Sequence, residues 1–88
     1  MEIIRLQSVN RSELHDVFEK LFSASSEPYG RNLDALYDCL TCRSQELTIE
    51  LDEASLLASL EDRYYDKLLR MLRDAAEENP AITLTVLE

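Results

Sequence analysis

The order of apolar periodicities along the chain constrains its fold more than any other feature. Three short segments, residues 2–6, 47–51 and 82–87, are rich in β-branched or alternating apolar residues, which favours β-strands. The two stretches between them carry apolar residues at helical spacing, and each is long enough to be a crossover. Because crossovers of this kind join parallel strands, the sequence predicts an α/β fold in which a small three-stranded parallel sheet packs with about four helices.

The first half of the chain carries clear helix signals. Asn10 or Ser12 can cap a first helix, and Glu13 follows Asn10 at the spacing of a capping box. Asn32 can cap a second helix after a loop at residues 23–30. The apolar side chains expected to face the core from these two helices are Leu14, Val17, Phe18, Leu21, Phe22, Leu33, Leu36, Tyr37 and Leu40.

The second half repeats the pattern. Asp52 can cap a short helix that ends near residue 60, and a longer helix spans residues 61–78 before Asn79 and Pro80, since proline cannot continue the hydrogen-bond ladder. Thr and Glu alternate with Ile and Leu in the last two strands, so we expect only one face of the sheet to be well covered. The apolar face expected for the longer helix comprises Tyr64, Leu68, Met71, Leu72 and Ala75.

The small size of the chain limits what it can do. Its 88 residues are 45% hydrophobic and 31% charged, a composition typical of one soluble globular domain, expected to span residues 1–88. A domain of this size buries only about 60% of the surface that its unfolded chain exposes. A catalytic pocket would have to form within this limited core, so we expect a protein that binds through its outer surface and is not an enzyme.

The charge is strongly acidic, with nine Lys and Arg against eighteen Asp and Glu and a formal net charge of −9. Phosphate groups are bound by Lys and Arg, so we expect no nucleic-acid partner, and an anionic membrane surface would repel the chain. A surplus of acidic groups favours solubility and also attracts metals or a basic protein. No segment approaches the roughly 20 apolar residues of a membrane span, and the N-terminus lacks a secretory pattern, so we expect a cytoplasmic location.

Two pairs of carboxylates share one helical spacing. Asp34 and Asp38 lie four residues apart on the second helix with Thr41 on the same face, and Asp74 and Glu78 lie four apart near the end of the longest helix. Like charges at this spacing repel, and carboxylates near a helix C-terminus oppose its dipole, which suggests a role other than stability. Paired carboxylates are also the catalytic groups of glycosidases. We do not expect a glycosidase here, because both pairs should lie on outer helix faces and the chain is too short for a substrate cleft.

The cysteines and the single histidine favour structural interpretations. Cys39 and Cys42 form a CxxC at the end of a helix, where the dipole does not stabilise a thiolate, so a thiol-disulfide enzyme is the least favoured alternative. A zinc site would need two further ligands. We expect His15 to be a surface residue beside Leu14, and we expect no metal or cofactor.

Gly30 is the single glycine and directly precedes the second helix, which predicts an unusual backbone angle or a close approach at this point. The spacing leaves open whether the neighbouring Tyr29 is a packed residue or an exposed contact.

Residues 29–41, Tyr-Gly-Arg-Asn-Leu-Asp-Ala-Leu-Tyr-Asp-Cys-Leu-Thr, resemble the signature segment of the barstar family. Residues 12–15 are similar to the family's first helix, and residues 72–84 to its last helix and strand. The family's fold, a three-stranded parallel sheet with helices, agrees with the fold predicted above. The resemblance implies a protein that inhibits a small, basic, guanyl-specific, secreted bacterial ribonuclease in a one-to-one complex and is a monomer when free.

The resemblance also implies which residues touch the enzyme. The second helix and the loop before it would enter the active-site groove. Asp38 corresponds to the carboxylate that takes the place of substrate phosphate, and Asp34 to a second carboxylate that pairs with enzyme cations. Asp74 corresponds to a further pairing acid, and Glu78 to one that acts at longer range. The other positions expected at the interface are Tyr29, Gly30, Asn32, Tyr37 and Thr41.

Four positions depart from the family pattern. Pro28, Tyr37 and Arg43 stand where the family has aromatic residues, two of them Trp, and Cys42 stands where a glycine is common. Arg43 would place a positive charge near the edge of a surface meant for a basic enzyme. These departures leave the target open, and the alternative is an acidic interaction module or antitoxin of the same fold that binds a different basic protein.

Overall fold

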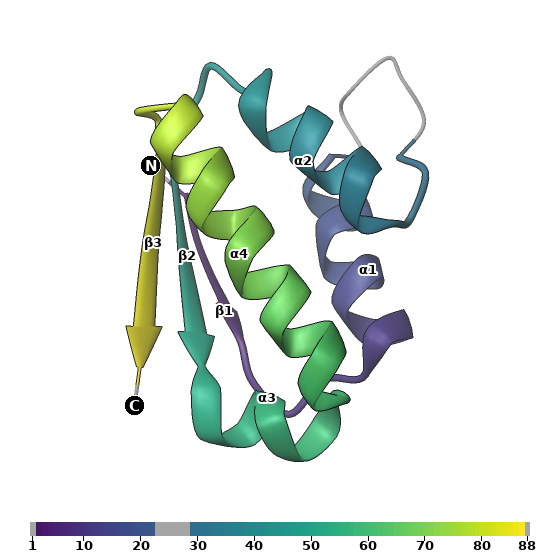
Figure 1. Cartoon of the computed structure of the whole chain (residues 1–88). Helices are drawn as coiled ribbons and strands as arrows, with labels where there is room; N and C mark the ends of the chain where they lie inside the picture. Colours follow the sequence, from purple (N-terminus) through teal and green to yellow (C-terminus); the bar gives the residue numbers. More distant parts are fainter. Residues whose placement is uncertain (1, 23–28, 88) are drawn as a thin grey trace.

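A computed structural model describes residues 2–22 and 29–87 of the chain, and the elements follow the expected order (Figure 1). The sheet has the order β1-β2-β3, and both strand pairs are parallel, which confirms the predicted α/β architecture. None of the described helices is long and apolar enough to cross a membrane. The elements are β1 (Glu2–Leu6), α1 (Arg11–Leu21), α2 (Leu33–Thr41), β2 (Leu47–Asp52), α3 (Glu53–Ser59), α4 (Asp62–Glu78) and β3 (Ile82–Leu87).

The sheet is covered on one face only, as predicted. Ile4, Ile49 and Leu84 lie side by side in the register and point to the helices, because alternate residues of a strand face opposite sides. On the other face Ile3 is 61% exposed. In Figure 1 α1, α2 and α4 lie on the covered side, and α3 lies at the end of the sheet where β2 finishes.

The helix caps explain where α1 and α2 begin. Asn10, not Ser12, caps α1: its side-chain oxygen accepts a 2.9 Å hydrogen bond from the backbone N–H of Glu13. The Glu13 carboxylate accepts a 3.1 Å bond from the Asn10 N–H in return, which completes the capping box. Asn32 caps α2 by accepting a 2.8 Å bond from the Ala35 N–H. Both helix starts are therefore fixed by residues immediately preceding them.

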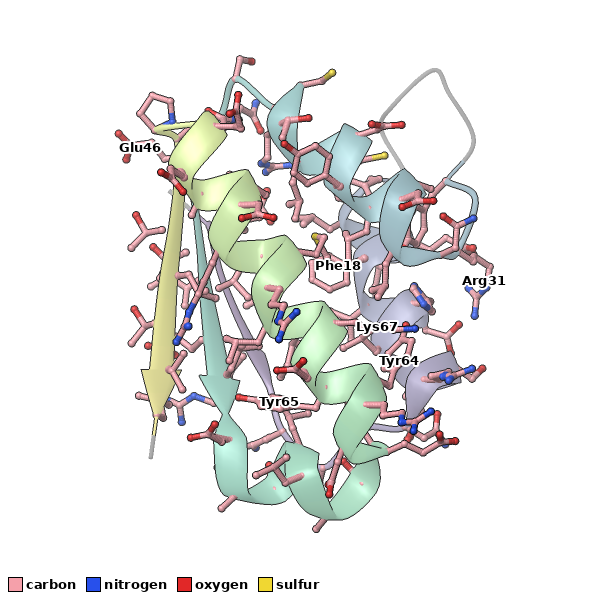
Figure 2. The ribbon with its side chains drawn as sticks, in the orientation of Figure 1. Phe18, Arg31, Glu46, Tyr64, Tyr65 and Lys67 are labelled. Carbon is pink, nitrogen blue, oxygen red and sulfur yellow. The ribbon has the colours of Figure 1, made fainter. Side chains whose placement is uncertain are left out.

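The core confirms most of the predicted apolar faces and corrects one. Phe18 and Leu68 are fully buried. On α4 the buried tyrosine is Tyr65, at 3% exposure, and not the predicted Tyr64, which is half-buried. Figure 2 shows Tyr65 directed toward the sheet and Tyr64 toward α1. The spacing explains the difference, since Tyr65, Leu68 and Leu72 share one face of the helix, which leaves Tyr64 at its edge.

Candidate functional site

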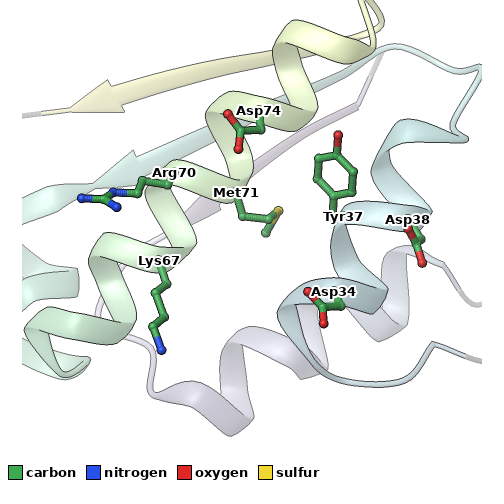
Figure 3. A pocket seen from close by; sticks show the side chains of 7 residues that line it. All are labelled: Asp34, Tyr37, Asp38, Lys67, Arg70, Met71 and Asp74. Carbon is green, nitrogen blue, oxygen red and sulfur yellow. The ribbon is translucent and has the colours of Figure 1, made fainter.

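A groove of about 450 Å³ lies between α2 and α4 (Figure 3). Its acidic residues come from both of the predicted pairs, which the sequence pattern placed on outer helix faces. All four carboxylates, Asp34, Asp38, Asp74 and Glu78, are indeed exposed. What the pattern did not indicate is that α2 and α4 pack side by side, so that three of them, Asp34, Asp38 and Asp74, line a common opening. The lining residues are Asp34, Tyr37 and Asp38 from α2, and Lys67, Arg70, Met71 and Asp74 from α4.

Tyr37 stands within the negative field of this groove. Burial and then the charges of Glu78, Asp74 and Asp38 raise the pKa of its phenol. Glu78 does not line the groove, but its field acts on the same hydroxyl. Tyr37 was expected on the buried face of α2; it is half-buried and packs against the core, and its ring also stands between the two helices (Figure 3). Its hydroxyl stays protonated at neutral pH and is a hydrogen-bond donor or acceptor for a ligand.

The groove also contains residues that the sequence did not indicate as part of a site. Lys67 and Arg70 line it from α4, and Met71, which packs against the core as expected, also forms part of its wall. A signal was present, because Lys67, Arg70 and Asp74 recur at intervals of three and four residues and so share one face of the helix. The pattern could not reveal that this face lies beside α2.

The loop before α2 is fastened to α1 by Arg31. Its guanidinium donates 2.9 Å hydrogen bonds to the carboxylates of Asp16 and Glu19 and a 3.3 Å bond to the carbonyl oxygen of Ser12. Arg31 itself has a φ of 56°, the left-handed conformation that non-glycine residues seldom adopt. These contacts offset the strain of that conformation and hold the loop at the start of α2.

Gly30 is explained by a close approach, one of the two alternatives, and not by its own backbone angle. Its φ is not positive, and the unusual angle belongs to the next residue, Arg31. A Cβ atom at Gly30 would lie 3.2 Å from the Cβ of Ala35 and 3.4 Å from Nδ2 of Asn32. A side chain at this position would therefore press on the first turn of α2, and Ala35 would have to move by a few tenths of an ångström.

Asn32 and Thr41 lie at the two ends of α2 and do not line the groove. Besides its cap bond, Asn32 donates from its side-chain nitrogen to the carbonyl oxygen of Gly30 at 3.2 Å. The Thr41 hydroxyl donates to the carbonyl oxygen of Tyr37 at 2.9 Å. Both side chains are engaged within the chain, and their contact with an enzyme stays a prediction.

His15 is not a surface residue, so the sequence expectation was wrong. The side chain is 6% exposed, with Nδ1 2.5 Å from the hydroxyl of Tyr29 and Nε2 2.8 Å from the hydroxyl of Tyr64. Burial, followed by the charges of Arg31 and Arg11, lowers the pKa of His15. The signal for this position was its spacing of three from Phe18 and seven from Phe22, which places it on the apolar face of α1.

Tyr29 is a packed residue, one of its two alternatives, and its contact with an enzyme stays a prediction. Its ring meets Phe22 edge-on with centroids 5.5 Å apart, and its hydroxyl contacts His15. Burial raises the pKa of Tyr29. The residue is half-buried, so the loop that leads into α2 rests on α1 through this tyrosine as well as through Arg31.

The four departures from the family pattern fall in different places. Arg43 points toward β1, where it forms a 3.2 Å ion pair with Glu2, and it does not line the groove. Cys42 ends α2 as its exposed C-cap, and within the described part of the chain it forms no disulfide with Cys39. Tyr37 lines the groove. Pro28 lies outside the described residues.

Carboxylates on two neighbouring helices, a phenol and an apolar wall define a small α/β protein with an acidic groove on its surface. Among the described residues no three His, Cys, Asp or Glu side chains lie close enough to hold a metal ion. A family model described as "Barstar (barnase inhibitor)" matches residues 2–87, and the chain therefore belongs to this family. Its members are inhibitors of a barnase-type ribonuclease and not enzymes. A comparison with curated protein sequences found no match.

Proposed function

We propose that this protein inhibits a basic, guanyl-specific, secreted bacterial ribonuclease by occupying its active site with α2 and the loop before it. One observation carries the proposal: in a chain of the barstar family, Asp34, Asp38 and Asp74 from two separate helices line a single groove. The complex is one-to-one, and the inhibitor is a monomer when free. It acts in the cytoplasm of the producing cell, where the enzyme would otherwise degrade RNA.

The chemistry of the groove suits an active site built for phosphate. Such a site presents cationic and hydrogen-bonding groups, and a carboxylate that replaces the substrate anion forms charge-assisted bonds there once water is excluded. In this proposal the Asp38 carboxylate occupies the phosphate position, and Asp34 and Asp74 pair with cations beside it. The net charge of −9 accelerates the encounter with a basic enzyme, an effect that weakens as salt is added.

Inhibition assays with Asp38 variants test the proposal. Wild-type protein should inhibit at least one enzyme of a panel of basic guanyl-specific ribonucleases. Asp38→Ala should weaken that complex by about 2–5 kcal/mol, or roughly 30- to 4,000-fold in Kd, because it leaves the enzyme's cations unpaired. Glu77→Ala is the matched control, since Glu77 is an exposed carboxylate of α4 that does not line the groove. This control should inhibit nearly as well as wild type.

Failure has two distinct meanings. If wild-type protein inhibits no enzyme of the panel, the alternative of an acidic module or antitoxin directed at a different basic protein is supported. If it inhibits but Asp38→Ala inhibits equally well, the family role of Asp38 does not hold in this chain. Cys39→Ser should leave inhibition unchanged. If this variant no longer inhibits, a thiol-dependent activity is supported instead.

A further inference from the structure

The groove contains cations as well as carboxylates. An inhibitor that only had to attract a basic enzyme would not need these cations. Lys67 and Arg70 line the groove from α4, three residues apart on the helix. In Figure 3 the Lys67 side chain extends from α4, across the opening from Asp34 on α2. A basic partner that enters the groove therefore meets a positive charge on α4 as well as the negative charges on α2.

Lys67 forms no ion pair with any residue that the structure describes. The ion pairs among the described residues engage other cations, for instance Arg31 with Asp16 and Arg43 with Glu2, and none engages Lys67. Although Asp34 lines the same groove, the two side chains do not form an ion pair. The ammonium group is exposed and available to a partner.

Arg70 is only weakly engaged. Its guanidinium lies 3.3 Å from the Asp66 carboxylate one turn earlier on α4, and both side chains are largely exposed. Exposed ion pairs of this kind on a helix surface contribute little to stability. Arg70 can therefore reinforce the positive charge of Lys67 when a partner approaches.

We propose that the cognate ribonuclease presents an Asp or Glu at the rim of its active site, and that this carboxylate pairs with Lys67 in the complex. The inference rests on the proposed function and narrows the target to an enzyme with a cationic centre and an acidic rim. Complementary charge patterns of this kind steer partner choice, because like charges brought together disfavour the wrong complex. Basic ribonucleases without the acidic rim residue meet an unpaired cation and bind more weakly.

A charge reversal at Lys67 distinguishes this proposal from a general electrostatic attraction, because the two predict opposite changes in the Kd. Lys67→Glu changes the formal net charge from −9 to −11, because a positive side chain becomes a negative one. If Lys67 acted only through the overall field, this variant would bind a basic enzyme more tightly. If Lys67 pairs with an enzyme carboxylate, we expect the Kd for the cognate ribonuclease to rise about tenfold or more.

Lys20→Glu is the matched control. It makes the same charge change at an exposed position in the last turn of α1, and Lys20 neither lines the groove nor takes part in an ion pair of the described residues. We expect this control to bind as tightly as wild type or more tightly. Thermal unfolding of both variants verifies that each is folded at the assay temperature.

The experiment uses the ribonuclease that wild-type protein inhibits most strongly, with Asp38→Ala measured alongside. Each Asp and Glu around the mouth of that enzyme's active site is then changed to Lys in turn, and one such enzyme variant should restore tight binding to Lys67→Glu while weakening binding to wild type. Equal or tighter binding of Lys67→Glu to the unchanged enzyme, or no restoring variant, would overturn the proposal. Loss of inhibition in Asp38→Ala would still support the proposed function in either case.

Discussion

The side-chain nitrogen of Asn79 donates a 2.8 Å hydrogen bond to the carbonyl oxygen of Leu40 and thereby joins the end of α4 to the end of α2. The same nitrogen lies 2.7 Å from the carbonyl oxygen of Arg43, and the side-chain oxygen accepts a 3.0 Å bond from the N–H of Ala81. The last carbonyl groups of a helix have no partner in their own helix. Asn79, only 8% exposed, supplies partners at the end of α2 and holds together the two helices that form the groove.

Asn79→Ala should lower the free energy of unfolding by about 2–3 kcal/mol, because it removes the hydrogen bonds to the carbonyl oxygens of Leu40 and Arg43 and the one from the Ala81 N–H. Urea unfolding measures the loss. Glu77→Ala on the same helix turn is the control and should change stability by less than about 0.5 kcal/mol. An Asn79→Ala protein with the urea midpoint of wild type would show that water replaces the amide without cost.

The pKa of His15 gives a pH dependence whose sign can be worked out. Because burial and the charges of Arg31 and Arg11 hold the folded-state pKa of His15 below its ordinary value of about 6.5, with Asp16 opposing them, the unfolded chain binds the proton more readily. The contribution of neutral His15 to the free energy of unfolding is therefore complete above about pH 6.5. It is lost as the pH falls through the folded-state pKa.

His15→Gln isolates this effect. The difference in free energy of unfolding between wild type and His15→Gln should be largest near neutral pH and should shrink toward pH 5, about 1.5 units below the ordinary histidine pKa. NMR titration of the His15 ring provides the direct check. A ring that titrates above pH 6.5, or a stability difference that grows on acidification, contradicts the assignment of a buried neutral imidazole.

Tyr29→Phe should destabilise the protein by about 1–2 kcal/mol, because the ring can still pack on Phe22 while His15 loses a hydrogen-bond partner. The raised pKa of Tyr29 keeps its phenol protonated at ordinary pH. The contribution of the hydroxyl to the free energy of unfolding is therefore present below about pH 10 and is lost only as the pH rises further. Urea unfolding at neutral and alkaline pH tests both statements. Tyr64→Phe removes the other hydroxyl partner of His15 and is the matched comparison. If neither variant is less stable, the histidine is satisfied by other groups.

The fold was predictable because its signals are local. The capping box of Asn10 and Glu13 and the cap at Asn32 mark helix starts within four residues, and strand periodicity depends on neighbours two positions apart. Parallel pairing then follows from the length of the crossovers. The one error in the α4 core, Tyr64 for Tyr65, is a displacement around one helix and does not alter the topology.

The site was less predictable because its geometry is not local. A helical wheel shows that Asp34 and Asp74 each lie away from the apolar face of their own helix, but it cannot show that the two helices bring them to one groove. Asn79 fastens those helices through backbone carbonyl groups about forty positions away in the chain, which leave no mark in a sequence pattern. Lys67 shares a helix face with Arg70 and Asp74, but the sequence cannot show that this face lines a groove beside α2.

Asp38→Ala should separate binding from stability. In the free protein this carboxylate lies four residues from Asp34, and the two like charges repel, so its removal should leave the free energy of unfolding unchanged or raise it by about 0.5 kcal/mol, helped by the better helix propensity of alanine. Urea unfolding at low and high salt measures this, and screening should reduce any gain from relieved repulsion. A loss of more than about 1 kcal/mol would assign Asp38 a structural role that no described contact explains. The expected result, a protein of normal stability that no longer inhibits, places the carboxylate in the groove for the enzyme and not for the fold.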